Sequence, residues 1–258
     1  MMGAEISDDG KYAVLTISFG CEAVNRLYVL PLGDDLGLPP GVGFGEAIGV
    51  VENFDAEYDY VCNEGTVFTF KTNHKAPRSK VVRVDLNDKE KYNKPETWPI
   101  LLQEDSKDVL EWAAALKGDV MMVCYLQNAR HVIQHRSLGT GDLVRSVEEL
   151  PVGSVSGFFG NRKEDTAFVK LTSFVSPGSV YKIDVSGGDS CEVELFSQTE
   201  LSCGNYKPED LVTEQVFVQS KDGTEVPMVR SLRENLCGIS TDSGVCSILV
   251  VVCDRPKG

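Results

Sequence analysis

Short runs of Val, Ile, Phe, Tyr and Thr, separated by Gly, Asp, Asn and Pro, make up most of the chain. Runs of this length and composition, bounded by turn residues, are typical of β-strands. The segment closest to helical periodicity is 106–116, SKDVLEWAAAL, and it can also be a turn that enters a strand. The pattern therefore predicts an all-β protein with many short strands.

The apolar runs also recur in a fixed order: a turn, an apolar strand, a polar connection and a second strand. The turns contain Gly10, Gly65, Gly118 and Asp165, which are spaced by 55, 53 and 47 residues. A weak repeat of about 50 residues, with some four strands in each copy, is typical of a β-propeller. A generic β-sandwich with accidental repetition is the alternative.

Each later repeat can be divided into four strands. We predict strands at 58–62, 66–72, 80–86 and 99–102 in the second repeat. The third repeat gives 110–116, 120–126, 131–137 and 142–147, and the fourth gives 155–159, 167–173, 179–185 and 191–195.

A further hairpin is predicted in the segment 214–230, EQVFVQSKDGTEVPMVR. Two short runs of β-formers, 216–218 and 226–229, flank a turn with the pair Asp222-Gly223. Asp-Gly is a strong signal for a tight turn because its backbone tolerates positive φ. Since an isolated hairpin is marginal in water, we expect it to join a sheet.

The charge and the cysteines narrow the choice of partners and compartment. The formal net charge is −14, which disfavours nucleic acids and anionic membranes as partners. The eight cysteines contain no C-x-x-C pair, so we expect reduced thiols and a cytoplasmic protein. The apolar run CSILVVVC is too short to span a bilayer.

The Gly/Pro-rich segment 33–49, GDDLGLPPGVGFGEAIG, does not have the spacing of a phosphate-binding loop. Gly41, Gly43 and Gly45 are followed by Glu46, and no Lys-Ser/Thr pair ends the segment. We therefore predict an ordinary loop, and no cofactor or metal site is expected.

Several long motifs resemble the prolyl oligopeptidase (prolyl endopeptidase) family of serine peptidases. They are AEISDDGKYAVLTIS, GCEAVNRLYVLPL, NFDAEYDYVCNEGTVFTFKTN, KDVLEWAAAL, TSFVSPGSVYKIDV and QVFVQSKDGTEVPM, and the similarity runs from about residue 1 to 229. The resemblance implies a seven-bladed propeller that caps an α/β-hydrolase domain, which cleaves short peptides after proline with a Ser-Asp-His triad.

On this resemblance, residues 1–204 form a partial β-propeller of about four four-stranded blades. Residues 205–230 correspond to the first strands of a truncated α/β-hydrolase domain, and 231–258 are a divergent tail. We expect a partial gene product or gene model. The chain would carry the gating propeller, and the missing hydrolase domain would be its partner.

No G-x-S-x-G nucleophile motif occurs in the 258 residues, and the segment 153–157, GSVSG, has Val155 at the serine position. His74 lies in a polar connection, while His131 and His135 stand four apart in a predicted strand and share one face. Packed or solvated histidines are expected. Ser240, Asp242 and Ser243 form a turn-like cluster without a histidine, so no catalytic residue is assigned.

The resemblance implies three candidates for the substrate cavity: Cys21, Met1 and Ser18. Cys21 matches a cysteine that the family places near the bound peptide, and Met1 aligns with a methionine in the same region. Ser18 stands where the family has a basic residue, which puts a charged contact to the peptide in doubt. For Cys21, a buried thiol at a strand end is the alternative.

Two functional classes remain open. The first is a fragment of a peptidase that acts on short proline-containing peptides, inactive alone. The second is a non-catalytic propeller module that binds peptides or proteins. Because an open arc of blades exposes apolar faces meant for burial, we also expect self-association.

Overall fold

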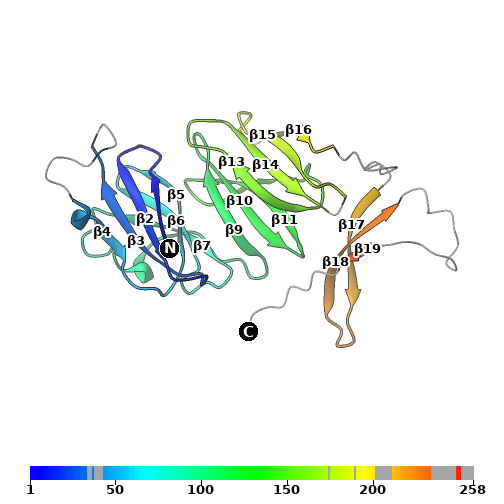
Figure 1. Ribbon diagram of the computed structural model, residues 1–258, viewed down its shortest axis with the longest axis horizontal. Coiled ribbons are helices and arrows are strands. Elements are labelled where there is room, and N and C mark those ends of the chain that lie inside the picture. The colour runs from blue at the N-terminus through cyan, green and yellow to red at the C-terminus, as the bar shows by residue number, and fades with distance from the viewer. Residues whose placement is uncertain are drawn as a thin grey trace. The chain divides into compact units, whose positions relative to one another are not determined.

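The computed structural model describes residues 1–33, 37, 43–173, 175–188, 190–200, 211–233 and 248–250 (Figure 1). Its regular structure consists of β-strands and two short 3₁₀ turns, η1 (Phe44–Glu46) and η2 (Pro95–Thr97). No helix in these ranges is long and apolar enough to cross a membrane.

Four sheets follow one another, each built from four strands in chain order. The first contains β1 (Met2–Ile6), β2 (Tyr12–Ser18), β3 (Asn25–Pro31) and β4 (Ile48–Val51). The second contains β5 (Tyr58–Glu64), β6 (Val67–Thr72), β7 (Lys80–Asp85) and β8 (Ile100–Leu102). The third contains β9 (Val109–Ala115), β10 (Val120–Gln127), β11 (Arg130–Ser137) and β12 (Leu143–Ser146). The fourth contains β13 (Ser154–Phe159), β14 (Thr166–Thr172), β15 (Ser179–Asp184) and β16 (Glu192–Gln198).

These sheets confirm the predicted all-β fold and the blade pattern. Each of the twelve strands predicted in the second, third and fourth repeats is present, with ends that differ by up to three residues. The segment 106–116 contains strand β9 and no helix. A sheet made of four consecutive strands is the unit of a propeller blade, so the alternative of a β-sandwich is not supported.

The repeated glycines lie at equivalent places in the first three sheets. Gly10, Gly65 and Gly118 each lie between the first and second strands of a sheet, with φ of +72°, +58° and +72°. Residues with a Cβ pay a steric penalty in this left-handed region, which glycine avoids. The sequence repeat therefore marks a backbone requirement of the turn.

The chain divides into two compact units. The first consists of Met1–Cys124, Gln134–Val144 and Asn161–Glu164, and the second of Tyr125–Ile133, Arg145–Gly160 and Asp165–Gly258. The sheets β1–β4 and β5–β8 belong wholly to the first unit, and the sheet β13–β16 belongs wholly to the second.

The core of the first unit lies where the sheets β1–β4 and β5–β8 face each other. Val14, Leu27 and Val29 come from the first sheet, and Phe68 and Phe70 come from β6. The Phe68 and Phe70 rings stack with centroids 6.0 Å apart. Burial of each such side chain contributes about 1.5–3 kcal/mol, so this cluster stabilises the pair of sheets.

In the second unit, the sheet β13–β16 buries one face and exposes the other. Ala167, Val169 and Leu171 alternate along β14 on the buried face. On the opposite face, Phe159 remains 68% exposed, and Phe196 packs edge-on against Phe168 with ring centroids 5.1 Å apart. This sheet therefore carries an apolar face that no described residue covers completely.

The hairpin predicted at 214–230 is present, with longer strands. Strand β17 (Leu211–Gln219) pairs with β18 (Glu225–Arg233), which also pairs with β19 (Ile248–Val250). Gly223 has φ of +84°, and the Asp222 carboxylate accepts the Thr224 N–H at 3.0 Å. The hairpin thus joins a sheet, as expected. The expected boundary at 204/205, residues 34–36 and 38–42 of the predicted loop, and most of the segment 231–258 lie outside the described residues.

Candidate functional site

Two of the three predicted cavity residues, Met1 and Ser18, meet at one edge of the first sheet. The Met1 ammonium donates to the Ser18 carbonyl at 2.9 Å, and the Ser18 N–H donates to the Met1 carbonyl at 2.8 Å. Cys21 follows in the turn between β2 and β3, and its thiol is free and exposed. The alternative of a buried Cys21 is therefore wrong, and the thiol is accessible to a ligand.

Two asparagines fix this turn against the second sheet. The Asn25 side chain donates to the Tyr58 carbonyl at 2.9 Å and accepts the Tyr58 N–H at 3.0 Å. The Asn73 amide donates to the Ala23 carbonyl at 3.0 Å. Because Asn25 is buried and its side-chain amide both donates to and accepts from the Tyr58 backbone, these bonds give the turn a defined position.

An aromatic pair and an arginine lie beside the same turn. The ring centroids of Phe19 and Phe54 are 5.4 Å apart, and Phe19 is 57% exposed. The Arg26 guanidinium carbon lies 4.5 Å from the Phe54 centroid, within the range of a cation–π interaction. None of these three residues was predicted from the sequence. The sequence shows an arginine just after the turn, but it does not show that Phe54, from the β4–β5 connection, packs beside that arginine.

This edge therefore offers a peptide an exposed thiol, an exposed aromatic ring and a guanidinium. Such a set can bind apolar and anionic groups, since the ring provides contact area and the guanidinium provides charge. The edge is suited to binding.

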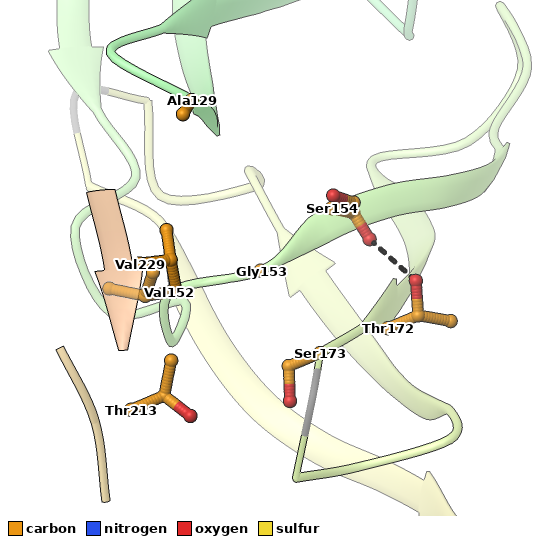
Figure 2. Close-up of a pocket in the computed structure, with 8 residues that line it drawn as sticks. All are labelled: Ala129, Val152, Gly153, Ser154, Thr172, Ser173, Thr213 and Val229. Carbon is orange, nitrogen blue, oxygen red and sulfur yellow. Dashed lines mark hydrogen bonds between the residues drawn. The ribbon is translucent and has the colours of Figure 1, made fainter. Parts of the chain in front are cut away.

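A second hollow lies in the second unit and has a volume of about 200 Å³ (Figure 2). Its lining is small and neutral: Ala129, Val152, Gly153, Ser154, Thr172, Ser173, Thr213 and Val229. Thr172 donates weakly to the Ser154 carbonyl at 3.4 Å. The hydroxyls can form hydrogen bonds, but the lining provides no acid, base or activated nucleophile.

The structure describes the surroundings of Ser154 and of the three histidines. Ser154 begins the extended strand β13, and no strained turn presents its hydroxyl. The His131 Nδ1 accepts the Val155 N–H at 2.8 Å, so this nitrogen is already used. His135 is buried on the same strand. Burial, helped by Lys75 and Lys80, lowers the pKa of His74, which favours a neutral imidazole.

Within the described residues, no group of three or more His, Cys, Asp or Glu side chains is arranged to hold a metal ion. The four cysteines described there are free thiols: Cys21, Cys62, Cys124 and Cys191. Ser240, Asp242 and Ser243 lie outside the described residues.

Four successive sheets, each of four antiparallel strands in chain order, define the class of fold as propeller-type. Residues 1–194 match the model of the prolyl oligopeptidase N-terminal β-propeller domain. The chain therefore belongs to this family, as its motifs predicted.

Known peptidases share the similarity over most of the chain. The prolyl endopeptidase of Elizabethkingia meningoseptica is 25% identical over 235 residues, which cover 91% of this chain and 30% of that protein. The dual function macrocyclase-peptidase POPB of Galerina marginata is 29% identical over 227 residues, which cover 88% and 29%. The chain thus spans about 30% of the length of the curated relatives it matches.

A solved structure supports the same fold. Prolyl oligopeptidase B from Galerina marginata, bound to a 35mer hydrolysis and macrocyclization substrate, aligns with a TM-score of 0.74 and 25% identity. The alignment covers 91% of this chain and 31% of the other.

Proposed function

We propose that these residues are the propeller part of a prolyl oligopeptidase-like serine peptidase, where they admit and hold short proline-containing peptides. Cleavage is assigned to a hydrolase domain that the 258 residues do not contain. The family match over residues 1–194 is the observation that carries the proposal. The hairpin β17–β18 supports the assignment of 205–230 to the first strands of that hydrolase domain.

The binding site that we propose is the turn with Cys21, together with Met1 and Ser18 at the sheet edge. Arg26 provides the positive charge that Ser18 does not. An extended peptide would contact the exposed Phe19 ring, while its anionic group would approach the Arg26 guanidinium. This arrangement is supported by the Phe19–Phe54 and Arg26–Phe54 contacts.

Protection of Cys21 from alkylation tests the binding step. A proline-containing octapeptide with a free carboxylate should slow alkylation of Cys21 by N-ethylmaleimide, followed by peptide mass spectrometry. The same peptide with alanine in place of proline is the control. Arg26→Met should weaken the protection about tenfold, as expected for loss of one charge-assisted contact. No protection by either peptide would exclude the site.

The hydrolysis assay tests the assignment of cleavage to a separate domain, and the protection assay separates the two functional classes. The 258-residue chain should not hydrolyse a fluorogenic prolyl amide, because acyl transfer needs an activated nucleophile and an oxyanion hole. A rate that a serine-directed phosphonate abolishes would contradict this. Equal protection by the proline and alanine peptides would favour the second class, a general peptide-binding module.

We also propose that the chain associates with itself in solution. Phe159 and Phe196 are 68% and 61% exposed on the sheet β13–β16, and burial of such rings favours association. Light scattering at micromolar concentration should detect oligomers, and Phe159→Glu should shift the chain toward monomers. A monodisperse monomer of the unaltered chain would exclude self-association. A cytoplasmic location is proposed from the free thiols, and cell fractionation tests it.

A further inference from the structure

A cavity of about 470 Å³ lies within the first unit, between the second and third sheets. Its lining comes from strands β5–β7 and from the turns after β9 and β11, and includes Cys62, Glu64, Thr69, Arg83, Asp119 and Leu138. The Cys62 residue is only 2% exposed. A polar cavity with a buried thiol in its wall is unlike the apolar core beside it.

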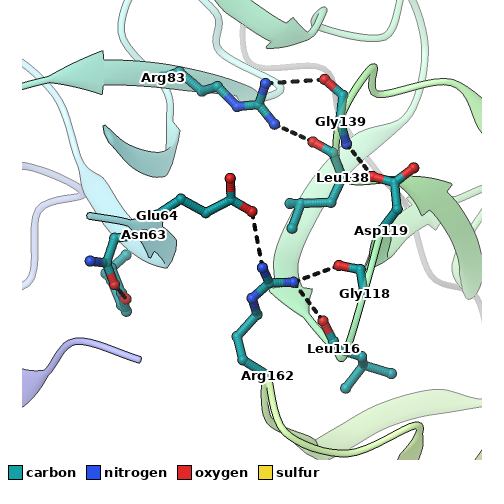
Figure 3. A network of polar contacts seen from close by, with 10 residues as sticks. Asn63, Glu64, Arg83, Leu116, Gly118, Asp119, Leu138, Gly139 and Arg162 are labelled. Atoms are coloured by element: carbon teal, nitrogen blue, oxygen red, sulfur yellow. Dashed lines mark hydrogen bonds and ion pairs between the residues drawn. The ribbon is translucent and has the colours of Figure 1, made fainter. Parts of the chain in front are cut away.

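Arg162 connects the turns next to this cavity (Figure 3). Its Nη1 donates to the Leu116 carbonyl at 2.8 Å and to the Gly118 carbonyl at 2.7 Å. Its Nη2 lies 3.1 Å from the Glu64 carboxylate. One guanidinium therefore holds the β5–β6 turn and the β9–β10 turn together.

Arg83 forms a second connection, made entirely to neutral groups. Its Nη1 donates to the Gly139 carbonyl at 3.0 Å, and its Nη2 donates to the Leu138 carbonyl (Figure 3). The Asp119 carboxylate accepts the Gly139 N–H and the Ser137 hydroxyl, which fixes the same turn. Within the part of the chain that the structure describes, Arg83 forms no ion pair with a carboxylate.

The connections through Arg162 and through Arg83 should therefore differ in their sensitivity to salt. The Glu64 side chain is 75% exposed, and salt screens an ion pair with so exposed a partner. Hydrogen bonds to carbonyls depend much less on salt. Of all these contacts, the ion pair between Arg162 and Glu64 is therefore the one that salt should weaken first, while the bonds from Arg162 to the Leu116 and Gly118 carbonyls depend less on salt.

We propose that Arg162 is a releasable bridge: when it detaches from Glu64 and the β9–β10 turn, the cavity opens and the Cys62 thiol becomes accessible while the unit stays folded. This inference is independent of the proposed peptidase function. It assigns a salt-sensitive opening to the junction of two blades.

Alkylation of Cys62 reports this opening. Burial raises the pKa of the Cys62 thiol, and the nearby Arg162 charge opposes that rise. Removal of Arg162 by itself would therefore raise the pKa further and slow the reaction of the thiolate. Faster alkylation after this change can come only from greater access.

The test compares Arg162→Met with Lys163→Met, which removes the same charge from an exposed side chain of the same turn. Each full-length chain is treated with N-ethylmaleimide at pH 8, and alkylation of Cys62 and Cys124 is followed separately by peptide mass spectrometry. We expect about tenfold faster alkylation of Cys62 in Arg162→Met only, since rapid opening makes the rate follow the open population. Equal rates in both variants would overturn the proposal.

Cys124, which is 0% exposed in β10, controls for global unfolding. If Arg162→Met alkylates Cys124 as fast as Cys62, the variant has unfolded, and two further measurements decide. Glu64→Gln, and a change from 0.05 to about 0.5 M NaCl for the unaltered chain, should each accelerate alkylation of Cys62 alone. If neither does so, the bridge is permanent and the proposal is wrong.

Discussion

The sheets β5–β8 and β13–β16 have the same architecture but different surroundings. Each has four antiparallel strands in chain order, and each has a register shift between its first two strands, at Tyr60/Cys62 and at Val155/Gly157. From Phe68 to Thr72, every residue of β6 is buried, whereas burial alternates along β14.

This difference shows that the hydrogen-bonded pairing of strands does not determine whether the faces of a sheet are buried. Hydrogen bonds along the ladders are equivalent in the two sheets, so they do not account for the contrast. A second packed sheet does: Tyr12 from β2 meets Phe68 edge-on at 5.3 Å. The exposed side of β13–β16 has no comparable neighbour among the described residues.

The largest expected difference in stability is between an aromatic substitution in β5–β8 and one in β13–β16. Phe70→Ala should destabilise the chain by about 3–5 kcal/mol, because it removes a fully buried ring that stacks on Phe68. At concentrations where the chain is monomeric, Phe159→Ala, at a position that is 68% exposed, should change stability by less than about 0.5 kcal/mol. Urea unfolding measures both. Similar losses would mean that the face with Phe159 is covered in solution.

The next effect concerns two glycines. Gly65→Ala should cost about 1–2 kcal/mol, since φ of +58° is strained for any residue with a Cβ. At Gly157, a Cβ would lie 3.6 Å from the Lys170 Cβ, an ordinary contact. Gly157→Ala should therefore be neutral within about 0.5 kcal/mol. Since an added Cβ has room at both positions, only the positive φ of Gly65 should separate the two variants in thermal unfolding, and equal losses would contradict this.

Replacement of two lysines should give a smaller difference in stability. Lys71 is buried, and its Nζ lies 2.7 Å from the Asp59 carboxylate, whose side chain is 48% exposed. Lys71→Ala should cost about 1 kcal/mol, since solvent weakens the pair while the buried stem also loses packing. Lys170 is exposed on β14, and its replacement by Ala should be close to neutral. Equal losses in urea unfolding would show that exposure does not govern this pair of sites.

The smallest effect is a difference in pH dependence. Burial raises the pKa of Asp8, whose N–H contacts Tyr60 of the second sheet, and the Arg162 charge opposes the rise. As the pH falls, Asp8 is protonated at a higher pH in the folded state than in the unfolded state, so its own contribution to stability becomes more favourable on acidification. This contribution should be less than about 1 kcal/mol, and the difference between the unaltered chain and Asp8→Asn measures it.

Asp184 in β15 should show the opposite sign. Hydrogen bonds from the Ser186 hydroxyl and N–H lower the pKa of Asp184. Its contribution is present above the unfolded-state pKa and is lost as the pH falls through the lower folded-state value. Unfolding of Asp184→Asn and Asp8→Asn between pH 3 and 7 compares the two. A shared sign would contradict the assignment of burial as the main cause at Asp8.

Prediction from sequence succeeded where the signal was local. The turn at Asp222-Gly223 and the repeated Gly10, Gly65 and Gly118 were recognisable because positive φ restricts the residue type at one position. The strands were recognisable from their composition. The cavity candidates Met1, Ser18 and Cys21 came from family resemblance, and their role stays a prediction.

Features formed between distant segments were not predictable. The Asn25–Tyr58 pair joins residues 33 apart, and the Arg162–Glu64 pair joins residues 98 apart. The residues next to Asn25 and Arg162 in the sequence do not indicate their partners, and asparagine and arginine are both common on protein surfaces. Register and packing choose the partner.

Strand positions, turn chemistry and the repeat were thus encoded locally, since each depends on the residues of one short segment. The two-sided burial of β5–β8, the open face of β13–β16 and the arginine bridges arose only when the sheets packed. Burial and ion pairing depend on which surfaces meet, and a sheet of given sequence has the same hydrogen-bonded ladder whether or not its face is covered.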